Sequence, residues 1–107
     1  DPAVQDTRGW VLLSQGKTFP ALALLRHAAL GLSQSVQMQC HLGAASEATG
    51  KRDWARRHYQ AAIDLGRELQ TKVDKARKEG TLLGWDVDPA DLAAIQTAHA
   101  KLKALDK

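Results

Sequence analysis

Cysteine is nearly absent from this chain: Cys40 is the single cysteine among 107 residues. A lone thiol excludes an internal disulfide and argues against a structural zinc site, which takes several sulfur or nitrogen ligands. It does not decide the cellular compartment. Because free cysteine most often packs as a small apolar side chain, we expect Cys40 to be buried, with a redox or metal role as the alternative.

Long apolar runs are also missing. No stretch approaches the ~20 consecutive apolar residues that a bilayer-spanning helix needs, and the first residues lack the pattern of a secretion signal. We therefore predict a soluble protein without membrane insertion. The chain opens on Asp1-Pro2, a favourable cap and first-turn pair for a helix, and we interpret it as one section of a longer protein, cut at the edge of a repeat.

Catalytic motifs are absent as well. The sequence has no nucleophile elbow, no glycine loop of the kind that cradles phosphate and no His-Glu-x-x-His, so we predict a protein that is not an enzyme and uses no cofactor or metal. Four near-neutral titrating groups remain, namely His27, His41, His58 and His99. Two convergent ligands are not visible among them, so we interpret them as surface or half-buried imidazoles, a metal or acid-base role being the alternative.

What the sequence does contain is an internal repeat: residues 9–28 recur 34 positions later as residues 43–62. The matched pairs are Gly9 and Gly43, Gly16 and Gly50, Lys17 and Lys51, Ala21 and Ala55, and Ala28 and Ala62. A constant period of this length is a signature of helical repeat proteins. We expect Gly16 and Gly50 to end helices in a left-handed conformation. A glycine inside a helix costs about 1 kcal/mol, so Gly9 and Gly43 predict a close approach of the partner helix.

These residues resemble the tetratricopeptide repeat family, whose pattern has a Leu-Gly pair on a first helix, then an alanine, a large residue and another alanine on a second. The second unit has Leu42-Gly43, Ala55, Tyr59 and Ala62, and the first has Arg8-Gly9, Ala21, Leu25 and Ala28. The family's early tryptophan is replaced by Gln5 and Gln39, and its closing proline by Ser33 and Arg67. The resemblance covers roughly residues 1–66 and implies an all-α solenoid of helical hairpins.

Helical periodicity extends this prediction to a single domain of about five helices. We expect them over residues 2–15, 19–32, 36–49, 53–78 and 88–105, with one repeat over about 1–34 and a second over about 35–68. The fourth helix should continue past Gly66 to about residue 78, because its apolar positions form one unbroken seam. The expected N-caps are Thr18, Ser33 or Ser35, and Asp88. The last helix is predicted to cap the solenoid, and the apolar segment around Trp85 to fold back onto the helices.

Protein binding is the function that the resemblance implies. In tetratricopeptide arrays the first helices of successive repeats line a concave groove that receives a peptide or a partner helix. Carried over by position, the groove residues are Ala3, Asp6, Trp10, Leu13, Ser14, Gln37, Cys40, Ala44 and Glu47. Trp10 is the expected anchor, since aromatic side chains dominate interface energies; the alternative is that Trp10 is a core residue, as most tryptophans are largely buried.

Two other functions remain open. Two repeats are fewer than the three or so that usually bury a continuous core, so exposed stacking faces could pair into a homodimer. Arg52, Arg56 and Arg57, in a chain of net charge +3, form a basic patch that could bind an acidic partner, an acidic polymer or nucleic acid. Acidic residues such as Asp53 and Asp64 are interleaved along the same helix, which favours a solvated surface over nucleic-acid binding.

The resemblance also separates subtypes of the family. Chaperone-binding members hold a C-terminal carboxylate with Lys and Asn, whereas the matching positions here are Asp6, Trp10 and His41, so that clamp is absent. The run Asp6-Thr7-Arg8-Gly9-Trp10-Val11-Leu12-Leu13 is similar to repeats in bacterial envelope and exopolysaccharide-export proteins. It implies a bacterial origin, with the cytoplasm and the periplasm both open as compartments.

Overall fold

The computed structural model describes residues 1–81 and 88–106, and these residues form five α-helices and no strand. The helices are α1 (Pro2–Ser14), α2 (Thr18–Leu32), α3 (Val36–Ala48), α4 (Arg52–Glu79) and α5 (Pro89–Leu105). The predicted all-α class and the predicted long fourth helix are confirmed. The expected return of the Trp85 segment to the helices lies outside the described residues.

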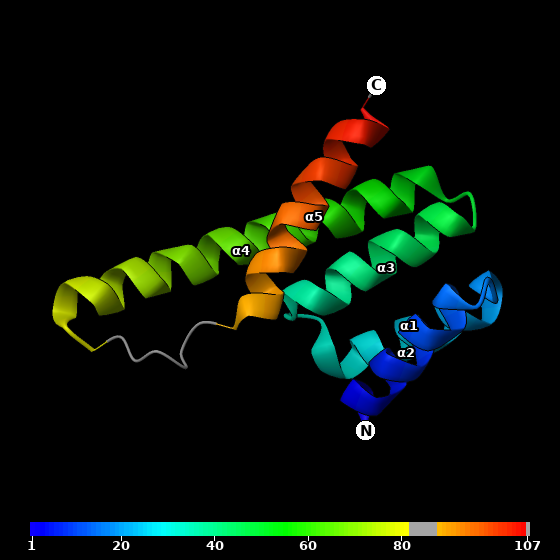
Figure 1. Ribbon diagram of the computed structural model, residues 1–107, viewed down its shortest axis with the longest axis horizontal. Helices are drawn as coiled ribbons and strands as arrows, with labels where there is room; N and C mark the ends of the chain where they lie inside the picture. Colours follow the sequence, from blue (N-terminus) through cyan, green and yellow to red (C-terminus); the bar gives the residue numbers. More distant parts are fainter. Residues whose placement is uncertain (82–87, 107) are drawn as a thin grey trace.

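The helices are arranged as two hairpins followed by a crossing helix (Figure 1). Helix α1 packs mainly against α2, and α3 packs mainly against α4, while the contact between α2 and α3 joins the two pairs. Helix α5 crosses α4 and also contacts α3. Helix α3 therefore lies between the first hairpin on one side and α4 and α5 on the other.

The two hairpin corners have the same backbone structure. Gly16 and Gly50 adopt positive φ angles of 77° and 80°, where a side chain would be strained. At the first corner the Lys17 amide donates to the Leu12 carbonyl at 2.9 Å, and at the second the Lys51 amide donates to the Ser46 carbonyl at 2.8 Å. These are the 6→1 hydrogen bonds of a Schellman motif, and they confirm that both glycines end helices as predicted.

Thr18 is not the N-cap of α2, so that prediction is wrong. Lys17 occupies the cap position, Thr18 is the first helical residue, and no side chain caps this end. The physical reason is the short corner, in which Lys17 both closes the preceding helix and begins the next one.

Three of the other helix starts follow local chemistry as predicted, whereas α4 begins after Lys51 without a side-chain cap. The Asp1 carboxylate accepts from the Ala3 amide at 3.0 Å, and the Asp88 carboxylate accepts from the Ala90 amide at 2.8 Å. Of the two serines considered for α3, Ser35 is the cap, accepting from the Met38 amide at 3.2 Å. At the C-terminal end of α4, Gly80 has a φ angle of 72° and stops the helix.

Buried side chains form two clusters on opposite sides of α3. One lies between α2 and α3 and contains Leu22, Leu25, Ala28, Met38, Leu42 and Ala45. The other lies among α3, α4 and α5 and contains Val36, Cys40, Ala55, Tyr59, Ala62, Ile63, Ala98 and Leu105. The second cluster explains why α5 stays on the second hairpin, since Ala98 and Leu105 are the buried residues of α5.

Candidate functional site

The first helices of the two hairpins carry a cluster with an exposed indole, which we call the Trp10 surface and define by Asp6, Trp10 and His41. The Trp10 side chain is on the outside of the protein, with 42% of its surface exposed. Its ring stacks on the His41 imidazole, with ring centroids 4.4 Å apart and an angle of 23° between the planes. The structure therefore places Trp10 at the surface, between α1 and α3, rather than in the core.

Asp6 fixes the imidazole on which Trp10 rests. The His41 Nδ1 atom lies 2.7 Å from Asp6 Oδ1, and both side chains are largely shielded from solvent. Asp6 stands one helical turn before Trp10 on α1, so the contact also ties α1 to α3. An indole held in one orientation loses little conformational entropy when a partner packs on it.

The remaining groove positions on α1 extend this surface along the helix. Leu13 is half-buried and packs against the α2–α3 core cluster, and Ala44 on α3 is also half-buried. Ala3 and Ser14 are exposed, and the Ser14 hydroxyl donates to the Trp10 carbonyl at 3.0 Å. Leu13 and Ala44 follow Trp10 and His41 by three residues, the spacing that keeps side chains on one helix face.

The other groove positions on α3 are tied to α4 and α5. The Gln37 amide donates to Asp91 at 3.0 Å and to Asp88 at 3.3 Å. The Glu47 carboxylate accepts from the Tyr59 hydroxyl at 3.1 Å and lies 3.9 Å from Lys101 Nζ. These contacts place Gln37 and Glu47 where α5 crosses, away from the Trp10 surface.

Cys40 is a core residue, which corrects its assignment to the groove and confirms the expectation that it is buried. Its side chain belongs to the α3–α4–α5 cluster and only 7% of the residue is exposed. Burial raises the pKa of its thiol, and the positive charge of Lys101 opposes this in part. The physical reason for the correction is that α5 covers this part of α3.

Two of the three arginines of the predicted basic patch hold the end of α5. Arg52 Nη2 and Arg56 Nη2 both donate to the Leu105 carbonyl, the latter at 2.9 Å. Arg56 Nε also lies 3.2 Å from Asp106 Oδ1 as an ion pair. The three arginines therefore do not form one free patch, since Arg52 and Arg56 satisfy the C-terminal carbonyl of α5, where positive charge is favourable.

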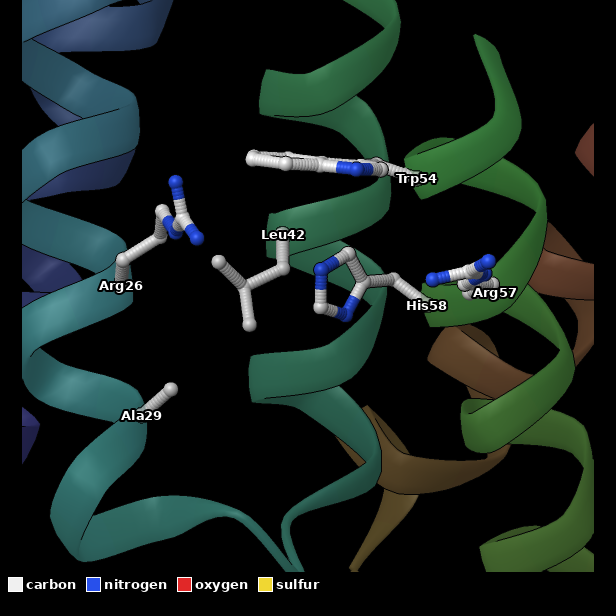
Figure 2. A pocket seen from close by; sticks show the side chains of 6 residues that line it. All are labelled: Arg26, Ala29, Leu42, Trp54, Arg57 and His58. Carbon is white, nitrogen blue, oxygen red and sulfur yellow. The ribbon is translucent and has the colours of Figure 1, made fainter. Parts of the chain in front are cut away.

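Arg57 instead reaches an open cavity between the second helices of the two hairpins, which we call the α2–α4 cavity (Figure 2). Its volume is about 370 Å³, and its lining consists of Arg26, Ala29, Leu42, Trp54, Arg57 and His58. The Arg26 guanidinium lies 4.3 Å from the centre of the Trp54 ring, and Lys51 Nζ lies 4.8 Å from it. This is a cation–π arrangement, in which the ring face attracts positive charge.

His58 lines the same cavity and is held by a polar contact on its other side. Its Nδ1 atom lies 2.9 Å from Gln39 Oε1. Burial lowers the pKa of His58, and the charge of Arg26 lowers it further. The imidazole is therefore mostly neutral at pH 7, and if Nδ1 carries the proton toward Gln39, Nε2 is a free acceptor.

The sequence does not predict this cavity. Trp54 and His58 are four residues apart on α4, which predicts that they share a helix face. Arg26 belongs to the other hairpin, and the repeat gives no arginine at the matching place in α4, which is Gln60. No local signal therefore brings Arg26 to Trp54.

The part of the chain that the structure describes shows neither a membrane-spanning helix nor a metal-binding cluster. None of its helices combines the length and the apolar character needed to cross a membrane, and it contains no group of three or more His, Cys, Asp or Glu side chains placed to hold a metal ion. Comparison of the chain with protein-family models, with curated proteins and with solved structures found no match.

Proposed function

We propose that this chain is a non-catalytic scaffold of the tetratricopeptide-like solenoid class, which binds a peptide or a partner helix along α1 and α3. The observation that carries the proposal is the exposed Trp10 ring, stacked at 4.4 Å on His41. The solenoid assignment is supported by two helical hairpins that share the same glycine corner at an offset of 34 residues. A bacterial origin is part of the same proposal and rests on the sequence resemblance alone.

The Trp10 surface has the properties of an interface anchor. Large aromatic side chains in a fixed orientation are over-represented among the few residues that dominate binding energy. Trp10 is already oriented by His41, and His41 is oriented by Asp6. Leu13 and Ala44 supply apolar surface on the same helix faces, so a partner could bury apolar side chains beside the indole.

A peptide library selected on the immobilised chain provides the ligand for a test. The dissociation constant of the best selected peptide is then measured by calorimetry for the wild-type chain and for Trp10→Ala. Loss of an anchor costs about 2 kcal/mol or more, so we expect roughly thirtyfold weaker binding. Circular dichroism should show that the variant stays helical.

The matched control is Phe19→Ala, because Phe19 is the other exposed aromatic residue of the first hairpin, with 68% of its surface exposed. Its removal should leave the affinity within about twofold, a change well under the 1.4 kcal/mol that makes a factor of ten. Equal binding by Trp10→Ala and the wild-type chain, or unfolding of Trp10→Ala, would refute the proposal.

Self-association is a second candidate, and the repeat itself favours it. Val4 and Val11 on α1 are 53% and 49% exposed, whereas the residues at the matching positions of α3, Met38 and Ala45, are both 0% exposed. In α3 this face is covered by α2. Helix α1 thus exposes the face whose counterpart in α3 is buried. A second copy of the chain could cover this face of α1.

Sedimentation equilibrium over a range of concentrations tests this candidate. The apparent mass of the wild-type chain should rise with concentration, while a Val4→Glu and Val11→Glu double variant should stay at the monomer mass. A wild-type chain that remains monomeric at every concentration would dismiss self-association without affecting the peptide-binding proposal.

A further inference from the structure

The α2–α4 cavity brings together positive charge that the described part of the chain does not neutralise. Arg26 on α2 and Arg57 on α4 come from opposite walls of the cavity (Figure 2). No acidic side chain is among the lining residues, and neither arginine forms an ion pair or a side-chain hydrogen bond with residues 1–81 or 88–106. Guanidinium groups match oxyanions because their N–H donors are arranged in a planar fork.

Apart from His58, the rest of the lining is apolar. The Trp54 ring closes one side of the cavity, with Arg26 beneath it, and Leu42 lies at the back with Ala29 beside it (Figure 2). Leu42 is only 2% exposed and belongs to the α2–α3 core cluster, so this wall is rigid. A planar or apolar group could therefore pack against Leu42 and the indole while its charged end meets the arginines.

We propose that the α2–α4 cavity binds an oxyanion, phosphate or carboxylate, attached to an aromatic or other apolar group. Ligand pockets are mostly apolar with a few placed polar groups and start at about 300 Å³, and this cavity has about 370 Å³. Arg26 and Arg57 attract the oxyanion from the two opposite walls of the cavity, while the neutral His58 can only accept a hydrogen bond, from a donor on the attached group. The site lies between α2 and α4, so it does not depend on the Trp10 surface.

Phenyl phosphate and benzoate are the probes for phosphate and carboxylate ligands, and phenol is the neutral control. Binding is followed by NMR at the indole N–H resonances, which are assigned with tryptophan-to-phenylalanine variants. We expect at least one of the two anions to move the Trp54 resonance in a saturable way, while the Trp10 resonance stays in place and phenol has little effect. The anion that binds more tightly shows whether the natural ligand carries a phosphate or a carboxylate.

Arg26→Gln and Arg57→Gln each remove one charge, and each should weaken binding about tenfold, the effect of losing one charge-assisted hydrogen bond. The matched control is Arg67→Gln on the same helix, because Arg67 has 75% of its side chain exposed and pairs locally with Asp64. Its affinity should stay within about twofold, since an exposed ion pair contributes little.

Three results would overturn the proposal: no saturable shift of the Trp54 resonance with either anion, equal shifts with phenol, or an equal loss of affinity in Arg67→Gln. The last result would show that the anion is attracted by the net charge of the protein and not by a specific binding site. Arg57 is exposed, so the Arg57→Gln variant decides the question even if Arg26→Gln alters the fold.

Discussion

Gly43 and Tyr59 are in contact so close that a Cβ atom at position 43 would lie 2.6 Å from Cε1 of the tyrosine ring. The first hairpin has the same relationship, because a Cβ atom at Gly9 would lie 2.6 Å from Cγ of Leu25. Contacts this short do not occur between real side chains, so the missing Cβ is what lets the helices meet. Each hairpin therefore has the same packing contact, in which a glycine on the first helix accommodates a large side chain from the second helix.

Gly43→Ala should destabilise the protein more than Gly9→Ala. The Tyr59 ring is fully buried and its hydroxyl is hydrogen-bonded to Glu47, so it cannot move aside easily, whereas Leu25 can change rotamer. Overpacking costs roughly 1–3 kcal/mol and better helix propensity returns about 1 kcal/mol. We expect a net loss of up to about 2 kcal/mol for Gly43→Ala in urea unfolding. A more stable Gly43→Ala variant would contradict the packing account.

Tyr59 should make stability depend on pH in the alkaline range. Burial raises the pKa of Tyr59, and the charge and hydrogen bond of Glu47 raise it further. A tyrosine of the unfolded chain ionises near pH 10, while the folded protein keeps the proton. The stabilisation is thus complete below about pH 10 and is lost as the pH rises toward the folded pKa.

The variant Tyr59→Phe isolates this effect. At pH 7 it should lose about 1 kcal/mol with the hydrogen bond to Glu47. Above about pH 10 its free energy of unfolding should fall less steeply than that of the wild-type chain. Parallel pH profiles of the two proteins, measured by urea unfolding, would show that Tyr59 does not titrate as its environment predicts.

Arg52 and Arg56 should stabilise the last turn of α5. Both donate to the Leu105 carbonyl, so an Arg52→Gln and Arg56→Gln double variant should lose about 1 kcal/mol. Amide hydrogen exchange in residues 102–105 should become faster than in the wild-type chain. As a control, Arg67→Gln with Arg77→Gln removes two arginines whose ion pairs, among residues 1–81 and 88–106, lie within α4, and it should leave α5 unchanged. Equal effects of the two double variants would contradict the assigned role.

Arg26→Gln should raise the pKa of His58. Burial, followed by the charge of Arg26, holds this pKa below its ordinary value. Removing Arg26 removes the second cause only, so the pKa should rise without reaching the ordinary value. Arg57 and Gln39, the other groups at the imidazole, stay in place. NMR titration of the His58 ring protons checks this, and an unchanged or lower pKa would place Arg26 too far from His58 to act on it.

Local chemistry made the helices predictable. The left-handed glycines at positions 16 and 50, the caps at Asp1, Ser35 and Asp88, and the stop at Gly80 all act within a few residues along the chain. The length of α4 was predictable for a related reason, because its apolar seam continues through Gly66. Thr18 was the exception, because Lys17 of the preceding corner occupies the N-cap position of α2.

The docking of α5 was not predictable from the sequence, and the errors about the site come from it. A Cβ atom at Gly66 would lie 2.7 Å from Cγ1 of Ile95, so α5 meets α4 at this glycine. That contact buries Cys40 and brings the Leu105 carbonyl to Arg52 and Arg56. No periodic pattern specifies which glycine a later helix will meet, just as none pairs Arg26 with Trp54.

Partner binding at the Trp10 surface is tested most directly by an NMR map of the chemical-shift changes that a library-selected peptide causes in the chain. Backbone and indole ¹H–¹⁵N resonances are compared with and without the peptide. We predict that the largest changes fall on the Trp10 indole and on Asp6, Leu13, His41 and Ala44, with the Trp54 indole unchanged. Changes concentrated at Trp54, or on the exposed Val4 and Val11 face, would contradict the proposed binding surface.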